Sequence, residues 1–173
     1  IVGRNAPFVG ITEQALNPGV AFGTLTFIPT SELATAVLGP RVVLVTDSVP
    51  NDIGFVGGLV TEALQTPLAH VNVLSQNRGT PNLAVLDARN RSEFEPFFGE
   101  LVRLEVSESG FTVRLADLAE AQAHWASIMP PGPAQTPARD LTVRGIQDLL
   151  DRDFTGIPSI GGKAAQFAEL YRI

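Results

Sequence analysis

The sequence has no cysteine among its 173 residues, which excludes a disulfide framework and any metal site built on thiolates. It also has no cluster of basic residues, since 12 lysines and arginines are outnumbered by 18 acidic residues and the net charge is −6. Without a basic patch the chain lacks the charge pattern of a nucleic-acid-binding protein. No apolar run reaches membrane-spanning length. We therefore expect neither nucleic acid nor a membrane as a partner.

The chain begins at Ile1 without an initiating methionine and without a charged segment followed by an apolar one, so a secretory leader is not indicated. This start predicts a piece of a longer, cytoplasmic polypeptide. With 45% hydrophobic residues, the chain is long enough for one core of ordinary size and a small appendage.

Alternating and continuous apolar patterns predict several strands and helices. A period of two, or a short β-branched run, predicts strands over residues 21–28, 41–46, 83–86, 101–106 and 111–115, the last two joined at Ser109-Gly110 as an antiparallel hairpin. Helical segments are predicted over 31–38, from a capping box at Ser92 to Gly99, and over 118–128 behind Asp117. This mixture predicts an α/β fold, with α+β as the alternative.

Four prolines between residues 129 and 137 predict an extended linker, because proline disfavours both helix and central strand. Beyond it, a helix is predicted over 162–171, and a further one from four apolar residues at helical spacing: Val143, Ile146, Leu149 and Leu150. Two helices cannot bury their own apolar faces. We therefore expect a domain over 1–128, a linker over 129–139, and the start of another domain over 140–173.

One of the two histidines lies in a short segment with clear helix signals. Thr66 is the predicted N-cap, Pro67 fits the first helical position, and Gly79 is suited to a left-handed stop. His70 is therefore predicted near the fourth helical position. There the positive end of the helix favours an added anion such as a phosphoryl group.

The pair Gly57-Gly58 and the run of residues 66–82 together resemble the swivelling phosphohistidine domain of the phosphoenolpyruvate-utilising enzymes. That family includes phosphoenolpyruvate synthase, pyruvate phosphate dikinase and the glucan water dikinases. Residues 17–23 are similar to the glycine-rich first strand of the domain. Residues 159–170, with Gly161, Gly162 and Lys163, resemble the opening of the family's ATP-grasp nucleotide-binding domain. The resemblance covers about residues 16–116 as a fold and 159–170 as a motif.

The resemblance implies a swivelling β/β/α domain of an ATP-dependent dikinase. His70 would be phosphorylated from ATP and would pass the phosphoryl group to pyruvate, to water with a glucan, or to another small molecule. The implied cofactors of the full-length protein are ATP and Mg²⁺, and the implied partners are an ATP-grasp domain and an acceptor domain of the same polypeptide. The residues implied to support the phosphoryl group are Thr66, Gly57, Gly58, Asn72 and Arg78. Lys163 is implied to bind the nucleotide.

The sequence departs from the family pattern next to the histidine, where Leu68-Ala69 replaces the usual Thr-Ser. This difference leaves a second hypothesis, a non-catalytic domain of the same fold that acts as a docking module. A third hypothesis is a hydrolase or isomerase that uses His70 with a loop carboxylate, for which the candidates are Asp47, Asp52 and Glu62. The other histidine, His124, has no comparable context and is predicted to be structural or on the surface.

Overall fold

The structure is a computed structural model that describes residues 8–129, 132 and 136–171. The chain divides into two compact units, the first ending at Met129 and the second beginning at Pro130. The predicted end of the first domain, at residue 128, lies next to this division, and the predicted boundary at residue 140 stays a prediction. Part of the predicted linker, residues 130–131 and 133–135, lies outside the described residues.

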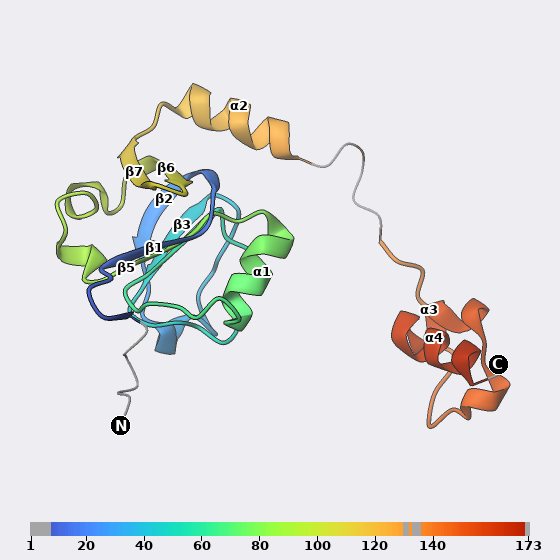
Figure 1. The fold of residues 1–173 in the computed structure, drawn as a ribbon. Coiled ribbons are helices and arrows are strands. Elements are labelled where there is room, and N and C mark those ends of the chain that lie inside the picture. The colour runs from blue at the N-terminus through green and yellow to red at the C-terminus, as the bar shows by residue number, and fades with distance from the viewer. Residues whose placement is uncertain (1–7, 130–131, 133–135, 172–173) are drawn as a thin grey trace, which may run out of the picture. The chain divides into compact units, whose positions relative to one another are not determined.

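The first unit is built on one seven-stranded sheet with the order β1-β5-β4-β3-β2-β6-β7. The strands are β1 (Glu13–Asn17), β2 (Gly19–Phe27), β3 (Val42–Thr46), β4 (Gly58–Thr61), β5 (Asn82–Val85), β6 (Leu101–Ser107) and β7 (Gly110–Leu115). Strands β2, β3, β4 and β5 run parallel to one another. Strand β1 pairs antiparallel with β5 at one edge, and the antiparallel β6–β7 hairpin extends the other edge by pairing antiparallel with β2. The sheet curls, so that β1 at one edge contacts β6 and β7, the two strands at the opposite edge (Figure 1).

Apolar residues fill both faces of this sheet, as expected for parallel strands that are covered on two sides. On β3, Val43 and Val45 belong to the cluster inside the curl, which also contains Phe94, while Leu44 belongs to the cluster that includes Val71 of α1 (His70–Arg78). Helix α1 therefore covers one face of the sheet (Figure 1). This packing fixes the start of α1 relative to the strand ends.

Elsewhere in the first unit, the described residues form α2 (Leu118–Ile128) and short 3-10 turns at Thr30–Glu32, Ala88–Asn90 and Glu95–Phe97. The predicted N-cap of α2 is confirmed, because the Asp117 carboxylate accepts a hydrogen bond from the backbone N–H of Ala119. The predicted capping box at Ser92 is wrong. Ser92 donates to the Glu93 carboxylate, and the helical turn begins only after Phe94, which is fully buried in the core.

The second unit contains 3-10 turns at Leu149–Asp151 and Phe154–Gly156, followed by α3 (Ile157–Ile160) and α4 (Gly162–Leu170). Helix α4 confirms the predicted helix at this position and buries Ala165 and Ala168. The helix predicted from Val143 to Leu150 is wrong, since Gly145 adopts a left-handed φ of 79°, which interrupts a right-handed helix. Among the helices of the described residues, none is long and apolar enough to cross a membrane.

Candidate functional site

Helix α1 presents His70 as its first residue. The N-cap is Ala69 rather than Thr66, and no side chain caps the helix N-terminus. The predicted position of His70 near the fourth residue is therefore wrong, because Thr66 to Ala69 form a turn instead, closed by a bond of 2.9 Å from the Ala69 N–H to the Thr66 carbonyl. The side chain of His70 is exposed. The imidazole thus lies closer to the positive end of the helix than the sequence indicates.

The His70 ring is also free of partners within the described part of the chain, where it makes no hydrogen bond, ion pair or ring contact. No described carboxylate oxygen lies within 4.0 Å of its nitrogens. The hydrolase or isomerase hypothesis requires such a carboxylate and is therefore not supported by the geometry. The exposed ring is therefore open to an external group.

The loop carboxylates considered for that hypothesis have structural partners. Asp47 accepts hydrogen bonds from the N–H and the hydroxyl of Thr30 at 2.8 and 2.7 Å, and these bonds lower the pKa of Asp47 below its usual value. Glu62 accepts from the Arg89 side chain, and Asp52 accepts from the N–H of Ile53. Asp47 and Glu62 thus hold loops at the carboxyl ends of β3 and β4, and Asp52 caps the backbone of its own loop.

The C-terminal end of α1 stops at Gly79, as predicted, with a left-handed φ of 65°. The guanidinium of Arg78 donates to the Ile53 carbonyl at 2.9 Å and so ties this end of α1 to a loop. Arg78 lies eight residues beyond His70, about 12 Å along the helix axis at about 1.5 Å per residue. The structure therefore does not bring Arg78 to the imidazole, and we assign it to loop packing.

The two glycines lie at the amino end of β4, whereas the loop to His70 leaves its carboxyl end. A Cβ on Gly57 would meet the Pro40 carbonyl oxygen at 2.5 Å, and one on Gly58 would meet the Ala21 Cβ at 3.0 Å. Both positions require glycine for close packing. The structure does not bring them to His70, and we assign them to the fold.

Gly57 and Arg78 instead line a cavity of about 280 Å³ at the amino ends of the parallel strands, together with Phe22, His124 and Trp125. His70 does not line it. His124 packs against Phe22 with ring centroids 4.9 Å apart, in agreement with a structural role.

Two of the predicted supporting residues are near His70 in the fold. Thr66 is exposed in the turn directly before α1. Asn72 is only 3% exposed, and its Nδ2 donates to the Pro67 carbonyl at 2.9 Å, so it holds that turn rather than facing an external phosphate. Thr66 remains a candidate contact of the phosphoryl group.

The sequence analysis missed a buried network of amides below this turn. Gln65 and Asn82 are both completely buried and exchange two hydrogen bonds, 3.0 Å from Gln65 Nε2 to Asn82 Oδ1 and 3.2 Å from Asn82 Nδ2 to Gln65 Oε1. Gln65 Nε2 also donates to the Thr61 hydroxyl at 3.0 Å, and Asn82 Nδ2 lies 3.5 Å from Asn72 Oδ1. The sequence signal for this network is weak, and consists of the polar residues Thr61 and Asn82 next to short apolar runs.

Lys163, the residue predicted to bind nucleotide, is exposed in the first turn of α4 in the second unit. Gly161 precedes it with a left-handed φ of 81°, which explains a glycine at that N-cap. Within the described residues, no group of three or more His, Asp or Glu could hold a metal ion.

A comparison of the sequence with models of known protein families finds no match, and a comparison with curated proteins also finds none. The fold is thus defined by the structure alone, as a mixed α/β unit with a curled seven-stranded sheet followed by a smaller helical unit.

Proposed function

We propose that this chain is the phosphoryl-carrier part of an ATP-dependent dikinase, with His70 as the residue that carries the phosphoryl group. The observation that carries the proposal is the position of His70, an exposed and unpartnered imidazole at the first residue of a helix without a side-chain cap. The sequence resemblance around His70 supplies the reaction class. The first unit then corresponds to the family's swivelling β/β/α domain, in a cytoplasmic protein.

The transfer uses an unprotonated ring nitrogen of His70 as the nucleophile. This nitrogen forms a bond to the β-phosphorus of ATP while the bond from that phosphorus to the oxygen bridging it to the α-phosphate breaks, and AMP leaves with that electron pair. Water or inorganic phosphate then takes the γ-phosphoryl group as the bond from the γ-phosphorus to its bridging oxygen breaks, so that one phosphoryl group remains on His70. In the last step an acceptor oxygen, which gives up its proton to solvent, attacks the remaining phosphorus, the N–P bond breaks, and the imidazole is regenerated. Pyruvate, water with a glucan, and other small molecules are the acceptor classes that the resemblance implies.

The start of α1 assists a phosphoryl group on His70 electrostatically. The first N–H groups of a helix have no carbonyl partners within the helix, and together with the helix dipole they favour an anion. Thr66, exposed in the preceding turn, adds a hydroxyl that can donate to the same group. Phosphoryl transfer depends mainly on such positioning and charge stabilisation.

The nucleotide belongs to a partner domain of the same polypeptide in this proposal. The second unit is the start of an ATP-grasp domain, and Lys163 contacts ATP phosphates once that domain is complete. Mg²⁺ bound with the nucleotide would neutralise phosphate charge, and no step on this chain is assigned to the metal. The Pro-rich segment 129–139 is one arm on which the carrier domain swivels between the ATP site and an acceptor domain.

The proposal is tested by incubating the complete natural polypeptide with ATP that is radiolabelled at its β-phosphate. We expect label that is lost in acid and stable in base, as for a phosphohistidine, and that is absent from His70→Ala. The matched control is His124→Ala, which removes the other histidine and should leave the labelling intact. Equal labelling of His70→Ala and the unaltered protein would refute the proposal.

The second candidate function is a non-catalytic docking module of the same fold. It is favoured by Leu68, which stands where the family has a hydroxyl and is 89% exposed beside His70. An exposed leucine suits a protein contact better than a phosphate contact. Under this alternative the polypeptide would bind its partner normally with His70→Ala and would never acquire label.

A further inference from the structure

The buried amides below the His70 turn form a continuous hydrogen-bonded path from the sheet to the start of α1. It begins at β5, where Asn82 pairs with Gln65 through two bonds, and it reaches β4 through the Thr61 hydroxyl. It continues from Asn82 to Asn72 Oδ1, and Asn72 Nδ2 then donates to the Pro67 carbonyl. We call these four side chains, Thr61, Gln65, Asn72 and Asn82, the amide network.

The amide network also fixes the middle of the loop between β4 and α1. The Thr61 hydroxyl donates to the Ala63 carbonyl at 2.8 Å, and the Gln65 N–H donates to Gln14 Oε1 on β1 at 2.8 Å. The loop from residue 62 to 69 is therefore held at Ala63, Gln65 and Pro67, immediately before His70. The tip of the loop, formed by Thr66, Pro67 and Leu68, is exposed to solvent.

Stability alone does not explain a network of this kind. Buried polar groups lose their hydration, and an apolar set of similar size is often as stable. What fully bonded amides provide is a single geometry, because each donor and acceptor has a fixed partner. The geometry fixed here is that of the turn that presents an exposed imidazole.

We infer that the amide network positions His70 for phosphoryl transfer, with Gln65 and Asn72 as positioning residues that do not touch the substrate. The inference rests on the proposed function of His70. In-line attack on phosphorus needs the nucleophile within a narrow range of positions, so disorder of the turn lowers the rate of transfer. The four side chains are buried and are therefore not placed to contact a nucleotide, so we expect their loss to leave nucleotide affinity unchanged.

The test uses Asn72→Leu and Gln65→Met, which keep the approximate size of each side chain and remove its amide. Ser75→Ala is the matched control, since Ser75 is also buried on α1 but its hydroxyl donates to the Val71 carbonyl of its own helix rather than to the amide network. A second control, Val102→Ala, weakens the core on β6, which carries none of the amides. The first readout is labelling of the complete natural polypeptide over a range of ATP concentrations.

We expect both network variants to label at least tenfold more slowly at saturating ATP, with KM for ATP within twofold of the unaltered protein. Ser75→Ala and Val102→Ala should retain the full rate at temperatures where they are folded. The second readout is hydrogen exchange of the Ala69 N–H, bonded to Thr66, which should become at least tenfold faster in the network variants than in the controls.

Each outcome decides the inference separately from the proposed function. Normal labelling rates in folded Asn72→Leu and Gln65→Met overturn the positioning role, and so does an equal loss of rate in Val102→Ala. If one network variant does not fold, the other supplies the comparison. Absence of label from the unaltered protein overturns the proposed function itself, and the exchange of the Ala69 N–H then still shows whether the amide network holds the turn.

Discussion

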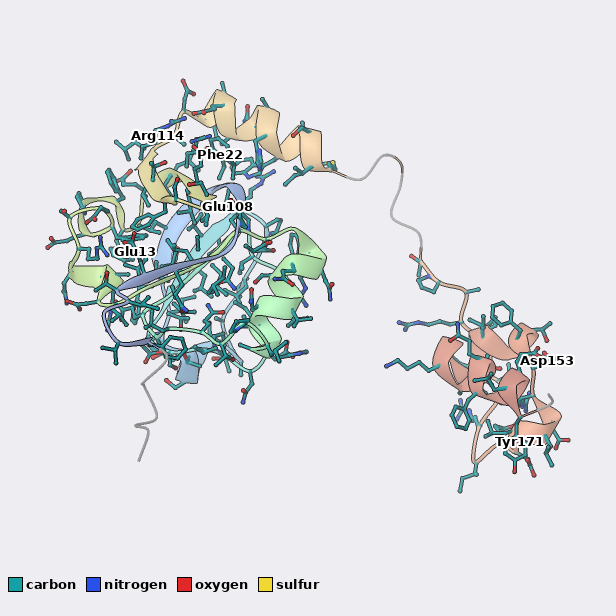
Figure 2. The ribbon with its side chains drawn as sticks, viewed as in Figure 1. Glu13, Phe22, Glu108, Arg114, Asp153 and Tyr171 are labelled. Carbon is teal, nitrogen blue, oxygen red and sulfur yellow. The ribbon has the colours of Figure 1, made fainter. Side chains whose placement is uncertain are left out.

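The indole N–H of Trp125 donates to the backbone carbonyl of Phe22 at 3.0 Å, joining residues 103 apart in sequence. Trp125 lies on α2, and Phe22, which is labelled in Figure 2, lies on β2, so this bond fastens the helix to the curled sheet. The guanidinium of Arg41 lies over the same indole, 4.6 Å from the ring centroid. Helix α2 is the last element before the Pro-rich segment.

Replacement of Trp125 by phenylalanine should therefore loosen α2 without unfolding the sheet. The change removes one hydrogen bond and part of the ring contact, and we expect a loss of about 1–2 kcal/mol in the free energy of unfolding. Urea unfolding followed by circular dichroism measures this loss. Ser127→Ala, on the same helix but exposed, is the control and should change the stability by less than about 0.5 kcal/mol. Equal stability of Trp125→Phe and the unaltered protein would contradict the contact.

A methyl group at position 58 should destabilise the fold. The Cβ of Gly58→Ala would lie 3.0 Å from the Ala21 Cβ and 3.2 Å from Leu104 Cδ2, both in the core inside the curl. Such overpacking costs about 1–3 kcal/mol. Gly39→Ala is the matched control, since no atom lies within 4 Å of its added Cβ. Denaturant unfolding of the two variants compares them, and a Gly58→Ala as stable as Gly39→Ala would show that the packing at β4 is looser than described.

The stability contributed by Glu93 should depend on pH. Its carboxylate accepts from Arg91 Nη2 at 2.6 Å, and this interaction lowers the pKa of Glu93 from 4.5 to about 2. Because the folded-state pKa is the lower one, the stabilisation is present above pH 4.5 and is lost as the pH falls toward 2. Unfolding of Glu93→Gln and the unaltered protein is compared across this range. We expect the variant to be less stable at pH 6 and the difference to shrink below pH 4.5, and a constant difference would argue against the ion pair.

Much of the sheet is predictable because its strands are marked by local patterns. The alternation at 21–28 and the β-branched run at 41–46 correspond to β2 and β3, and the hairpin corresponds to β6 and β7. Strand β1 was not expected, since its pattern is weak and it is defined by pairing with β5, far along the chain. The curl and strand order also depend on such distant pairings and carry no local signal.

For the candidate site, the position of His70 at a helix start can be predicted from the sequence, whereas most of the contacts around it cannot. His70 at the start of a helix, and Gly79 at its end, follow from the sequence. The residue at which the helix begins cannot be predicted in the same way, because Asn72 donates to the Pro67 carbonyl and stabilises residues 66–69 as a turn outside the helix. Gln65 and Asn82 are 17 residues apart and meet only because β4 and β5 pair. Their partnership therefore could not be predicted from spacing.

The most direct measurement of the central claim identifies the phosphorylated atom. The complete natural polypeptide, treated with ATP and digested at neutral or basic pH, is analysed by mass spectrometry of the peptide that contains residues 66–78, with ³¹P NMR to show an N–P bond. The proposal predicts one phosphoryl group per chain, on a ring nitrogen of His70. Phosphate on any other residue, or none on His70 in a protein that consumes ATP, would contradict it.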